Sequence, residues 1–146
     1  MNVKNIAIAG DHAGFLYKKE IKQLLENKGI KVQDFGTDSE ESTDYPDYIH
    51  PLAKSVIAGE NELGIIICGS GNGVNMTANK YDEIRSALCW ETEIAELSRL
   101  HNNANVVAIP ARFISLEKAE EIVNVFISTD FEGGRHQRRV EKISCK

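Results

Sequence analysis

Two glycine-rich segments hold most of the reactive side chains of this sequence. They are Gly10–Gly14, which reads GDHAG, and Cys68–Gly73, which reads CGSGNG, and each directly follows a short apolar run. Glycine lets backbone N–H groups turn toward a ligand, and a following helix presents its positive N-terminal end. The second segment is therefore predicted to bind an anion. Because it lacks the GxGxxG spacing and the P-loop lysine, the alternative is a turn that binds nothing.

Cys68 stands where an apolar run ends and this loop begins. A helix N-terminus stabilises a thiolate, and a thiolate at this position could remove a proton from carbon. The alternative is an inert buried cysteine, an interpretation that suits Cys89 well. The third cysteine, Cys145, lies near the end of the chain. An odd number of cysteines without a CxxC pair or a metal-like Cys/His spacing predicts neither a disulfide scaffold nor a metal site.

Two histidines have polar neighbours: His12 follows Asp11, and His101 precedes Asn102. Residues 91–100 are predicted to form a short helix that returns the chain to the opposite edge of the sheet, far from Cys68. If Cys68 and His101 serve one site, a twofold dimer in which His101 enters the neighbouring subunit is the expected solution.

The segment 133–146 is rich in basic residues and contains Arg135 and Arg139 at a spacing of four. A helix would place both guanidinium groups on one face, where they could bind a phosphate dianion. The alternative is a solvated basic helix end that interacts with its own carbonyl groups.

Charge and composition narrow the functional class. The chain has 146 residues, 17 Lys and Arg against 22 Asp and Glu, and 42% hydrophobic residues. We expect a single folded domain over residues 1–146. The acidic excess lies outside the basic C-terminal segment, so no broad basic face for nucleic acid is expected. Without a long apolar run or a leader-like start, we expect a cytoplasmic protein that does not enter membranes.

Apolar runs alternate with amphipathic stretches along the whole sequence, which is typical of a βαβ protein. Four apolar runs (6–9, 65–68, 86–89 and 106–109) are predicted as central strands, and the mixed segment 30–35 as an edge strand. Helices are predicted to end at Gly29 and at Gly59, and another to begin after Ser115. The expected fold is α/β: a Rossmann-like three-layer αβα sandwich whose five-stranded parallel sheet has an order near 2-1-3-4-5, with the ligand beyond the carboxyl ends of the strands.

Six sequence blocks occur in an order that resembles the B-type ribose-5-phosphate isomerases, within the family that also contains allose- and galactose-phosphate isomerases. The blocks are AGDHAG, TDYPDY, ICGSGNG, ANK, RLHNNANV and EGGRHQRRV. The resemblance covers nearly the whole chain. It implies an aldose–ketose isomerase that interconverts ribose 5-phosphate and ribulose 5-phosphate through an enediolate, with no cofactor and no metal. It also implies a homodimer or homotetramer whose active sites are shared between subunits, with the segment 133–146 contributing to the site and the interface.

The resemblance further implies a role for each matching residue. Cys68 is the base that moves the proton, and His101 is the acid/base that opens the sugar ring. The predicted substrate-binding residues are Asp11, His12, Tyr45, Gly69, Ser70, Gly71, Asn72, Gly73, Asn102, Arg112, Arg135 and Arg139. Among these, Gly69–Gly73 form the anion hole for the enediolate, and the three arginines bind the phosphate.

The loop departs from the family pattern at three positions. Some relatives carry a glutamate six residues after the strand end, where this chain has Val74, so the base is assigned to Cys68. Asn72 and Asn75 differ from the residues common in the cysteine-dependent members, which leaves a six-carbon sugar phosphate (allose 6-phosphate or galactose 6-phosphate) as the alternative substrate. A phosphosugar- or nucleotide-binding module without turnover is an alternative from another class. A dehydrogenase is disfavoured because the dinucleotide motif is missing.

Overall fold

The computed structural model describes residues 2–145. Residues 1 and 146, the two ends of the expected domain, lie outside the described residues, and residue 146 is also the end of the basic segment 133–146. Strands and helices alternate along the chain. They are β1 (Asn5–Gly10), α1 (Phe15–Asn27), β2 (Lys31–Asp34), α2 (Pro46–Ile57), β3 (Leu63–Cys68), α3 (Asn72–Ala78), β4 (Ser86–Leu88), α4 (Thr92–Leu100), β5 (Val106–Pro110), α5 (Leu116–Ser128) and α6 (Arg135–Glu141).

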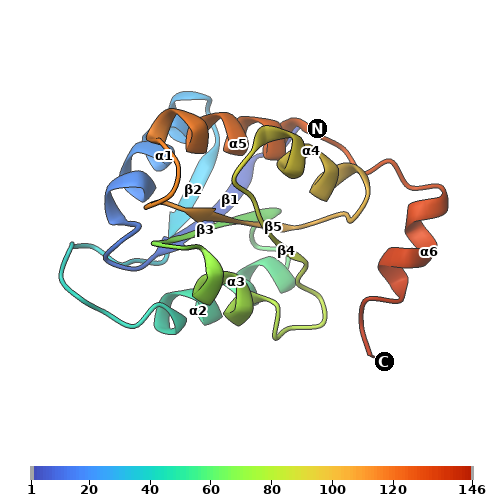
Figure 1. Ribbon diagram of the computed structural model, residues 1–146, viewed down its shortest axis with the longest axis horizontal. Helices are drawn as coiled ribbons and strands as arrows, with labels where there is room; N and C mark the ends of the chain where they lie inside the picture. Colours follow the sequence, from blue (N-terminus) through green and yellow to red (C-terminus); the bar gives the residue numbers. More distant parts are fainter. Residues whose placement is uncertain (1, 146) are drawn as a thin grey trace.

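Within the described part of the chain, five strands form one parallel sheet in the order β2-β1-β3-β5-β4. Helices α1, α4 and α5 cover one face and α2 and α3 cover the other, as Figure 1 shows. The predicted α/β sandwich is confirmed, and so is the edge position of the mixed segment 30–35, in which β2 lies.

The order of the last two strands differs from the predicted order: β5 lies where β4 was expected, and β4 lies where β5 was expected. β5 pairs with β3, whereas β4, expected as a central strand, pairs only with β5 and forms the edge. The burial explains this order. All five residues of β5 are buried, whereas the three residues of β4 are only half-buried. A short, partly wet strand suits an edge.

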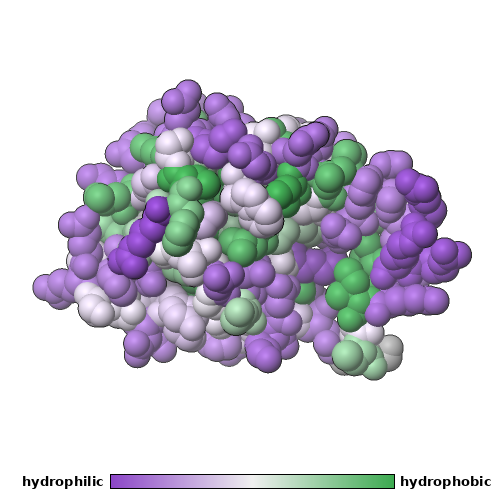
Figure 2. All heavy atoms as spheres, in the orientation of Figure 1, coloured by the Kyte–Doolittle hydropathy of each residue, from purple (hydrophilic) through white to green (hydrophobic). Residues whose placement is uncertain are grey.

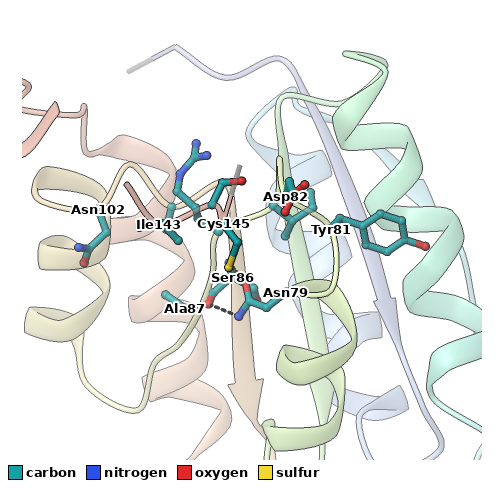
Figure 3. A pocket seen from close by; sticks show the side chains of 12 residues that line it. Asn79, Tyr81, Asp82, Ser86, Ala87, Asn102, Ile143 and Cys145 are labelled. Atoms are coloured by element: carbon teal, nitrogen blue, oxygen red, sulfur yellow. Dashed lines mark hydrogen bonds between the residues drawn. The ribbon is translucent and has the colours of Figure 1, made fainter. Parts of the chain in front are cut away.

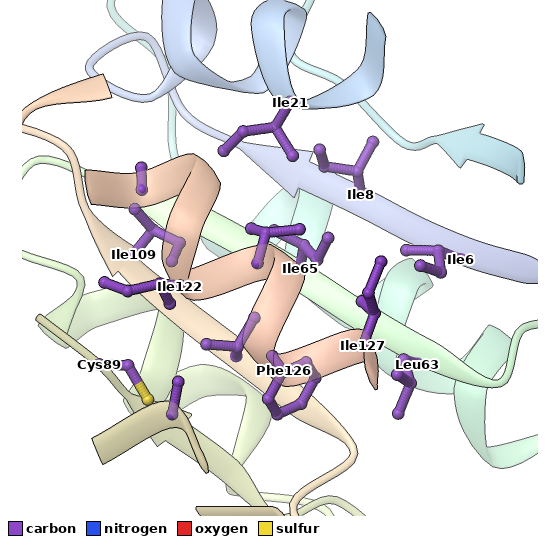
Figure 4. Packing of buried hydrophobic residues seen from close by; sticks show 14 of the residues in the cluster. Ile6, Ile8, Ile21, Leu63, Ile65, Cys89, Ile109, Ile122, Phe126 and Ile127 are labelled. Atoms are coloured by element: carbon purple, nitrogen blue, oxygen red, sulfur yellow. The ribbon is translucent and has the colours of Figure 1, made fainter. Parts of the chain in front are cut away.

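Alternation along each strand divides the core between the two faces. Ile6 and Ile8 of β1 pack on the side of α1 and α5, whereas Ala7 and Ala9 face α2. Figure 4 shows the first side, where Phe126 and Ile122 of α5 pack over Ile65 of the sheet. The small side chains of the second face leave room for α2 to pack closely on the strands. Cys68, at the end of β3, belongs to this second face.

The helix ends follow the predicted signals. Gly29 and Gly59 have positive φ angles of 80° and 77° just beyond α1 and α2, a conformation that favours glycine. The side chain of Ser115 accepts a hydrogen bond from the backbone N–H of Lys118 at 3.0 Å and so caps α5. α6 stands apart from the layered body (Figure 1). No helix among residues 2–145 has the length and apolar character needed to cross a membrane.

Candidate active site

A cavity of about 600 Å³ lies beyond the carboxyl ends of β1, β3 and β5. This is where the fold predicts a ligand. The cavity brings together eight of the side chains or glycines singled out in the sequence: Asp11, His12, Tyr45, Cys68, Gly69, Ser70, Gly73 and Arg112. Gly71 lies in the same β3–α3 loop, and Asn72 is the first residue of α3. We call these ten residues the strand-end group.

The loop after β3 turns its backbone toward the sulfur of Cys68. The backbone N–H of Gly71 donates a hydrogen bond to Cys68 Sγ at 3.1 Å. Gly71 has a φ of 77°, and a Cβ there would lie 2.4 Å from Leu88 Cδ1, so the turn depends on glycine. An N–H group that points at sulfur stabilises negative charge on it. The local structure therefore suits a thiolate.

Cys89 contrasts with Cys68. It lies on the other face of the sheet, in the core under α4 and α5, as Figure 4 shows. Burial raises the pKa of its thiol to about 12. Cys89 is therefore a packing residue, as the sequence suggests.

Asp11 shapes the loop after β1. Its Oδ1 accepts hydrogen bonds from the backbone N–H groups of Ala13 at 3.0 Å and Gly14 at 3.2 Å. A Cβ on Gly14 would lie 2.5 Å from the carbonyl oxygen of Ile67, so the loop packs directly on β3. Since Oδ1 is engaged in the turn, Oδ2 is the oxygen that can accept a hydrogen bond from a ligand hydroxyl.

Tyr45 and Arg112 cover the β3–α3 loop from two sides. A Cβ on Gly73 would lie 2.5 Å from Cζ of Tyr45, so the phenol ring rests on the first turn of α3. A Cβ on Gly69 would lie 3.1 Å from Cδ of Arg112, whose side chain extends over the loop. A phenol and a guanidinium group therefore border the same backbone amides.

Four lining residues were missed in the sequence: Ala13, Thr43, Asp44 and Phe113. The backbone N–H of Thr43 donates a hydrogen bond to His12 Nδ1 at 3.2 Å, and its hydroxyl bonds the hydroxyl of Tyr48 at 2.7 Å. Phe113 is 76% exposed at the rim. Thr43 and Phe113 are neighbours of residues that were found, Tyr45 and Arg112, but nothing in their types marks them as ligand contacts.

The other predicted site residues lie elsewhere in the chain. His101 ends α4, Asn102 follows it, and Arg135 and Arg139 belong to α6. We call these four residues the tail group. The helix over Arg135–Glu141 places the two arginines on one face, as predicted. His101 precedes β5, whereas the strand-end group follows the strands. The two groups are therefore separated by the length of β5, five residues at about 3.3 Å each.

Contacts with the tail surround His101. Its ring stacks on that of His136, with centroids 4.2 Å apart and an interplanar angle of 14°. Its Nε2 lies 3.8 Å from Glu132 Oε2. Burial, followed by the nearby His101, lowers the pKa of His136. His101 is thereby held against the segment that carries the two arginines.

Asn102 lines a second cavity, of about 410 Å³, beside the edge strand β4. Figure 3 shows the side chains that line this cavity, among them Asn79 and Ser86 near β4 and Ile143 and Cys145 of the C-terminal segment. None of the strand-end group lines this cavity.

Comparisons with known proteins agree on one family. The model of the ribose/galactose isomerase family matches residues 6–143. Ribose-5-phosphate isomerase B of Escherichia coli is 46% identical over 143 residues, which cover 98% of this chain and 96% of that protein. The crystal structure of a ribose 5-phosphate isomerase from Thermotoga maritima superimposes with a TM-score of 0.94 at 50% identity, over 98% of each chain. The Mycoplasma genitalium ribose-5-phosphate isomerase B, whose structure holds ribulose 5-phosphate, gives 0.91 at 42% identity, over 95% of this chain and 93% of that one.

Proposed function

Because the chain belongs to the ribose/galactose isomerase family, we infer that it is an aldose–ketose isomerase that interconverts ribose 5-phosphate and ribulose 5-phosphate. One observation assigns this function to particular atoms: the sulfur of Cys68, which lines the strand-end cavity, accepts a hydrogen bond from the N–H of Gly71. The roles that follow for individual residues are our proposal.

Cys68 acts as the base. Its thiolate takes the proton from C2 of the open-chain aldose, the C2–H electron pair forms the C1–C2 double bond, and the carbonyl oxygen on C1 becomes the enediolate oxygen. A proton then passes from the C2 hydroxyl to the oxygen on C1, and the thiol returns its proton to C1 as the ketone forms at C2, which restores the thiolate. Proton removal next to a carbonyl requires a base within hydrogen-bond reach and donors aimed at the oxygen that gains charge.

The β3–α3 loop supplies these donors. Residues 69–73 present backbone N–H groups at the start of α3, where the helix dipole also favours an anion. Two of these groups are engaged within the loop, that of Gly71 with Cys68 Sγ and that of Asn72 with Ser70 Oγ, and the others are the donors for the enediolate oxygen. Asp11, His12 and Tyr45 border the same cavity and bind the sugar hydroxyls. Arg112 lies over Gly69 and binds the phosphate.

The tail group completes the site from a second subunit. His101 opens the furanose ring, Asn102 binds the sugar, and Arg135 and Arg139 bind the phosphate. The separation of the two groups within one chain supports a shared site, since no folded single chain of this form brings His101 beside its own Cys68. The segment from 133 onward supports the same arrangement. α6 stands off the body (Figure 1), and hydrophobic atoms show on the side of the C-terminal segment that faces the body (Figure 2). Ile143, which follows α6, is 56% exposed.

The assay that tests this function uses EDTA-treated protein with ribose 5-phosphate, allose 6-phosphate and galactose 6-phosphate. We expect the highest kcat/KM with ribose 5-phosphate. Replacing Cys68 by serine should remove about 3–4 kcal/mol of transition-state stabilisation, roughly 10²–10³-fold in rate, because a hydroxyl is a poorer base than a thiol.

Cys89→Ala is the matched control, since Cys89 is a packing residue on the other face of the sheet and outside the strand-end cavity. It should leave turnover unchanged. Near-normal turnover by Cys68→Ser would exclude Cys68 as the base, and higher activity on a six-carbon sugar would replace the proposed substrate. The cytoplasmic location stays a prediction.

A further inference from the structure

Three side chains outside the strand-end cavity point ligand atoms at one another. Nε2 of His101 lies 3.8 Å from Oε2 of Glu132, and Nε2 of His136 lies 4.0 Å from the same oxygen. One ligand atom from each residue falls within 4.8 Å of the others. The proposed isomerase reaction uses His101 alone, so the arrangement of Glu132 and His136 around it requires a separate explanation.

Two chain segments hold this cluster together. His101 ends α4, and the backbone N–H of Glu132 donates to the carbonyl oxygen of Leu100 at 3.1 Å. His136 follows four residues after Glu132, in the first turn of α6. The backbone contact at Leu100 therefore fixes both residues of the C-terminal segment beside His101, and the cluster forms within one chain.

His136 contributes a buried nitrogen that lacks a hydrogen bond. Its side chain is 8% exposed, and Nε2 has no hydrogen-bond partner among the described residues. A buried polar atom without a partner destabilises the fold, and such atoms frequently mark a missing ion or water.

We propose that His101, Glu132 and His136 form a binding site for a divalent transition-metal ion, with Zn²⁺ as the best match. Two imidazole nitrogens and one carboxylate oxygen are a donor set that Zn²⁺ uses, with a fourth position left to water. Bonds of about 2.0–2.2 Å place tetrahedral ligand atoms roughly 3.4 Å apart. The observed separations of 3.8 and 4.0 Å are close to this value.

Binding requires one local movement. Stacked rings direct their nitrogen lone pairs side by side, so one ring must turn before both can meet the same ion. His101 and Glu132 are free to adjust because their side chains are 38% and 55% exposed, whereas His136 is fixed by burial. The proposed site therefore consists of one fixed ligand, the buried imidazole of His136, and two ligands that can move, His101 and Glu132.

The consequence of binding rests on the proposed function. A metal ion bound to the His101 ring takes up its basic lone pair, so the ring can no longer exchange a proton with the ring oxygen of the sugar. Zn²⁺ is therefore an inhibitor of the reaction of the cyclic sugar phosphate, and no step of the isomerisation uses it.

Binding is measured first, without reference to activity. Full-length protein stripped with EDTA is titrated with ZnSO₄ against a chromophoric chelator, and with CoCl₂ while the visible absorption of Co²⁺ is recorded. We expect one ion per chain and a tetrahedral Co²⁺ spectrum. Glu132→Gln and His136→Phe should weaken binding at least tenfold. Phenylalanine retains a ring that can stack on His101.

Two controls separate this site from other metal ligands. His50→Phe changes a histidine whose Nδ1 bonds the hydroxyl of Tyr81, away from the cluster. Cys68→Ser removes the thiol of the strand-end cavity. Both should bind Zn²⁺ as the unchanged protein does. Full binding by His136→Phe, or loss of binding by Cys68→Ser, would overturn the proposed site.

Inhibition is then measured with ribose 5-phosphate. Zn²⁺ should abolish turnover of the unchanged protein, and EDTA should restore it. His136→Phe should be active without metal and should need at least tenfold more Zn²⁺ for half-inhibition. Binding at the cluster without loss of turnover would overturn the inhibitory role. Absence of turnover before any metal is added would contradict the isomerase function and leave the binding result intact.

Discussion

The position of His12 defines which of its nitrogens can meet a substrate. Nδ1 accepts the backbone N–H of Thr43, so in the neutral ring the proton resides on Nε2. That nitrogen is therefore a hydrogen-bond donor. The hydroxyl of Thr43 is tied to Tyr48, whose ring packs against Gly36 and steadies the loop that orients His12.

Replacing His12 by glutamine or by asparagine distinguishes the role of Nε2 from that of Nδ1. Glutamine can place an N–H donor near the position of Nε2, whereas asparagine can accept from Thr43 but does not reach the substrate. We expect His12→Gln to stay within about tenfold of the original kcat/KM. His12→Asn should lose a further 2- to 10-fold, the equivalent of about 0.5–1.5 kcal/mol for a hydrogen bond to a neutral sugar hydroxyl. Steady-state kinetics on both variants measure this difference, and equal losses would refute the assigned tautomer.

Sequence patterns identify reactive residues best where a strand ends in a glycine-rich turn. Cys68 and Asp11 are predictable because their place at the carboxyl ends of parallel strands follows from the fold alone. Thr43 and Phe113 are not predictable in this way. Thr43 contributes a backbone N–H group, which every residue type except proline would supply. Which chain supplies His101 to a given site depends on assembly, and the folding pattern of one chain does not specify it.

At the scale of elements, a buried ion pair joins α1 to β2. Nζ of Lys18 lies 2.7 Å from both carboxylate oxygens of Asp34, and its side chain is only 2% exposed. Oδ1 of Asp34 also accepts the backbone N–H of Gly36 at 2.9 Å. The pair thereby fixes the start of the loop that leads to Thr43 and Tyr45. A lysine on an amphipathic helix is ordinarily interpreted as a surface residue, so this contact cannot be predicted from the sequence.

Replacing Lys18 alone should destabilise the fold more than replacing both Lys18 and Asp34. Lys18→Met leaves the Asp34 carboxylate without its main partner and should lower the free energy of unfolding by about 3 kcal/mol, near the lower bound for buried pairs because Lys22 remains 3.7 Å from Asp34. The double variant Lys18→Met/Asp34→Asn should recover part of the loss. Urea denaturation of the single and double variants measures both values. A double variant that is less stable than Lys18→Met would contradict this account.

Element boundaries are largely predictable, but the order of the last two strands is not. Helix ends at Gly29, Gly59 and Ser115 follow from local chemistry. The exchange of β4 and β5 depends on which strand is buried on both faces in the finished sheet. Both segments are short apolar runs, so their periodicity carries no information about which of them lies in the middle.

At the scale of the whole molecule, the strand-end group and the tail group must come from different chains if they serve one site. In a twofold dimer, each site then takes Cys68 from one subunit and His101 from the other. Every dimer has two such sites, and each subunit takes part in both.

Mixing two inactive variants tests this exchange. Cys68→Ala and His101→Ala should each be inactive on the cyclic sugar, but a hybrid dimer contains one site with both original residues. Random association of equal amounts should restore about a quarter of the original activity, since half of the dimers are hybrids and each has one intact site. Activity after co-expression or subunit exchange measures this fraction. A mixture as inactive as its components would place Cys68 and His101 in the same subunit's site.

The position of β5 between β3 and β4 also governs how the chain folds while it is being made. β1, β2 and β3 find their partners in the order in which the ribosome releases them. β4 pairs only with β5, so residues 86–88 have no neighbouring strand until residues 106–110 emerge. Domains generally fold as units. The complete sheet, and with it the cavity at the ends of β1, β3 and β5, can therefore form only after residues 106–110 have left the ribosome.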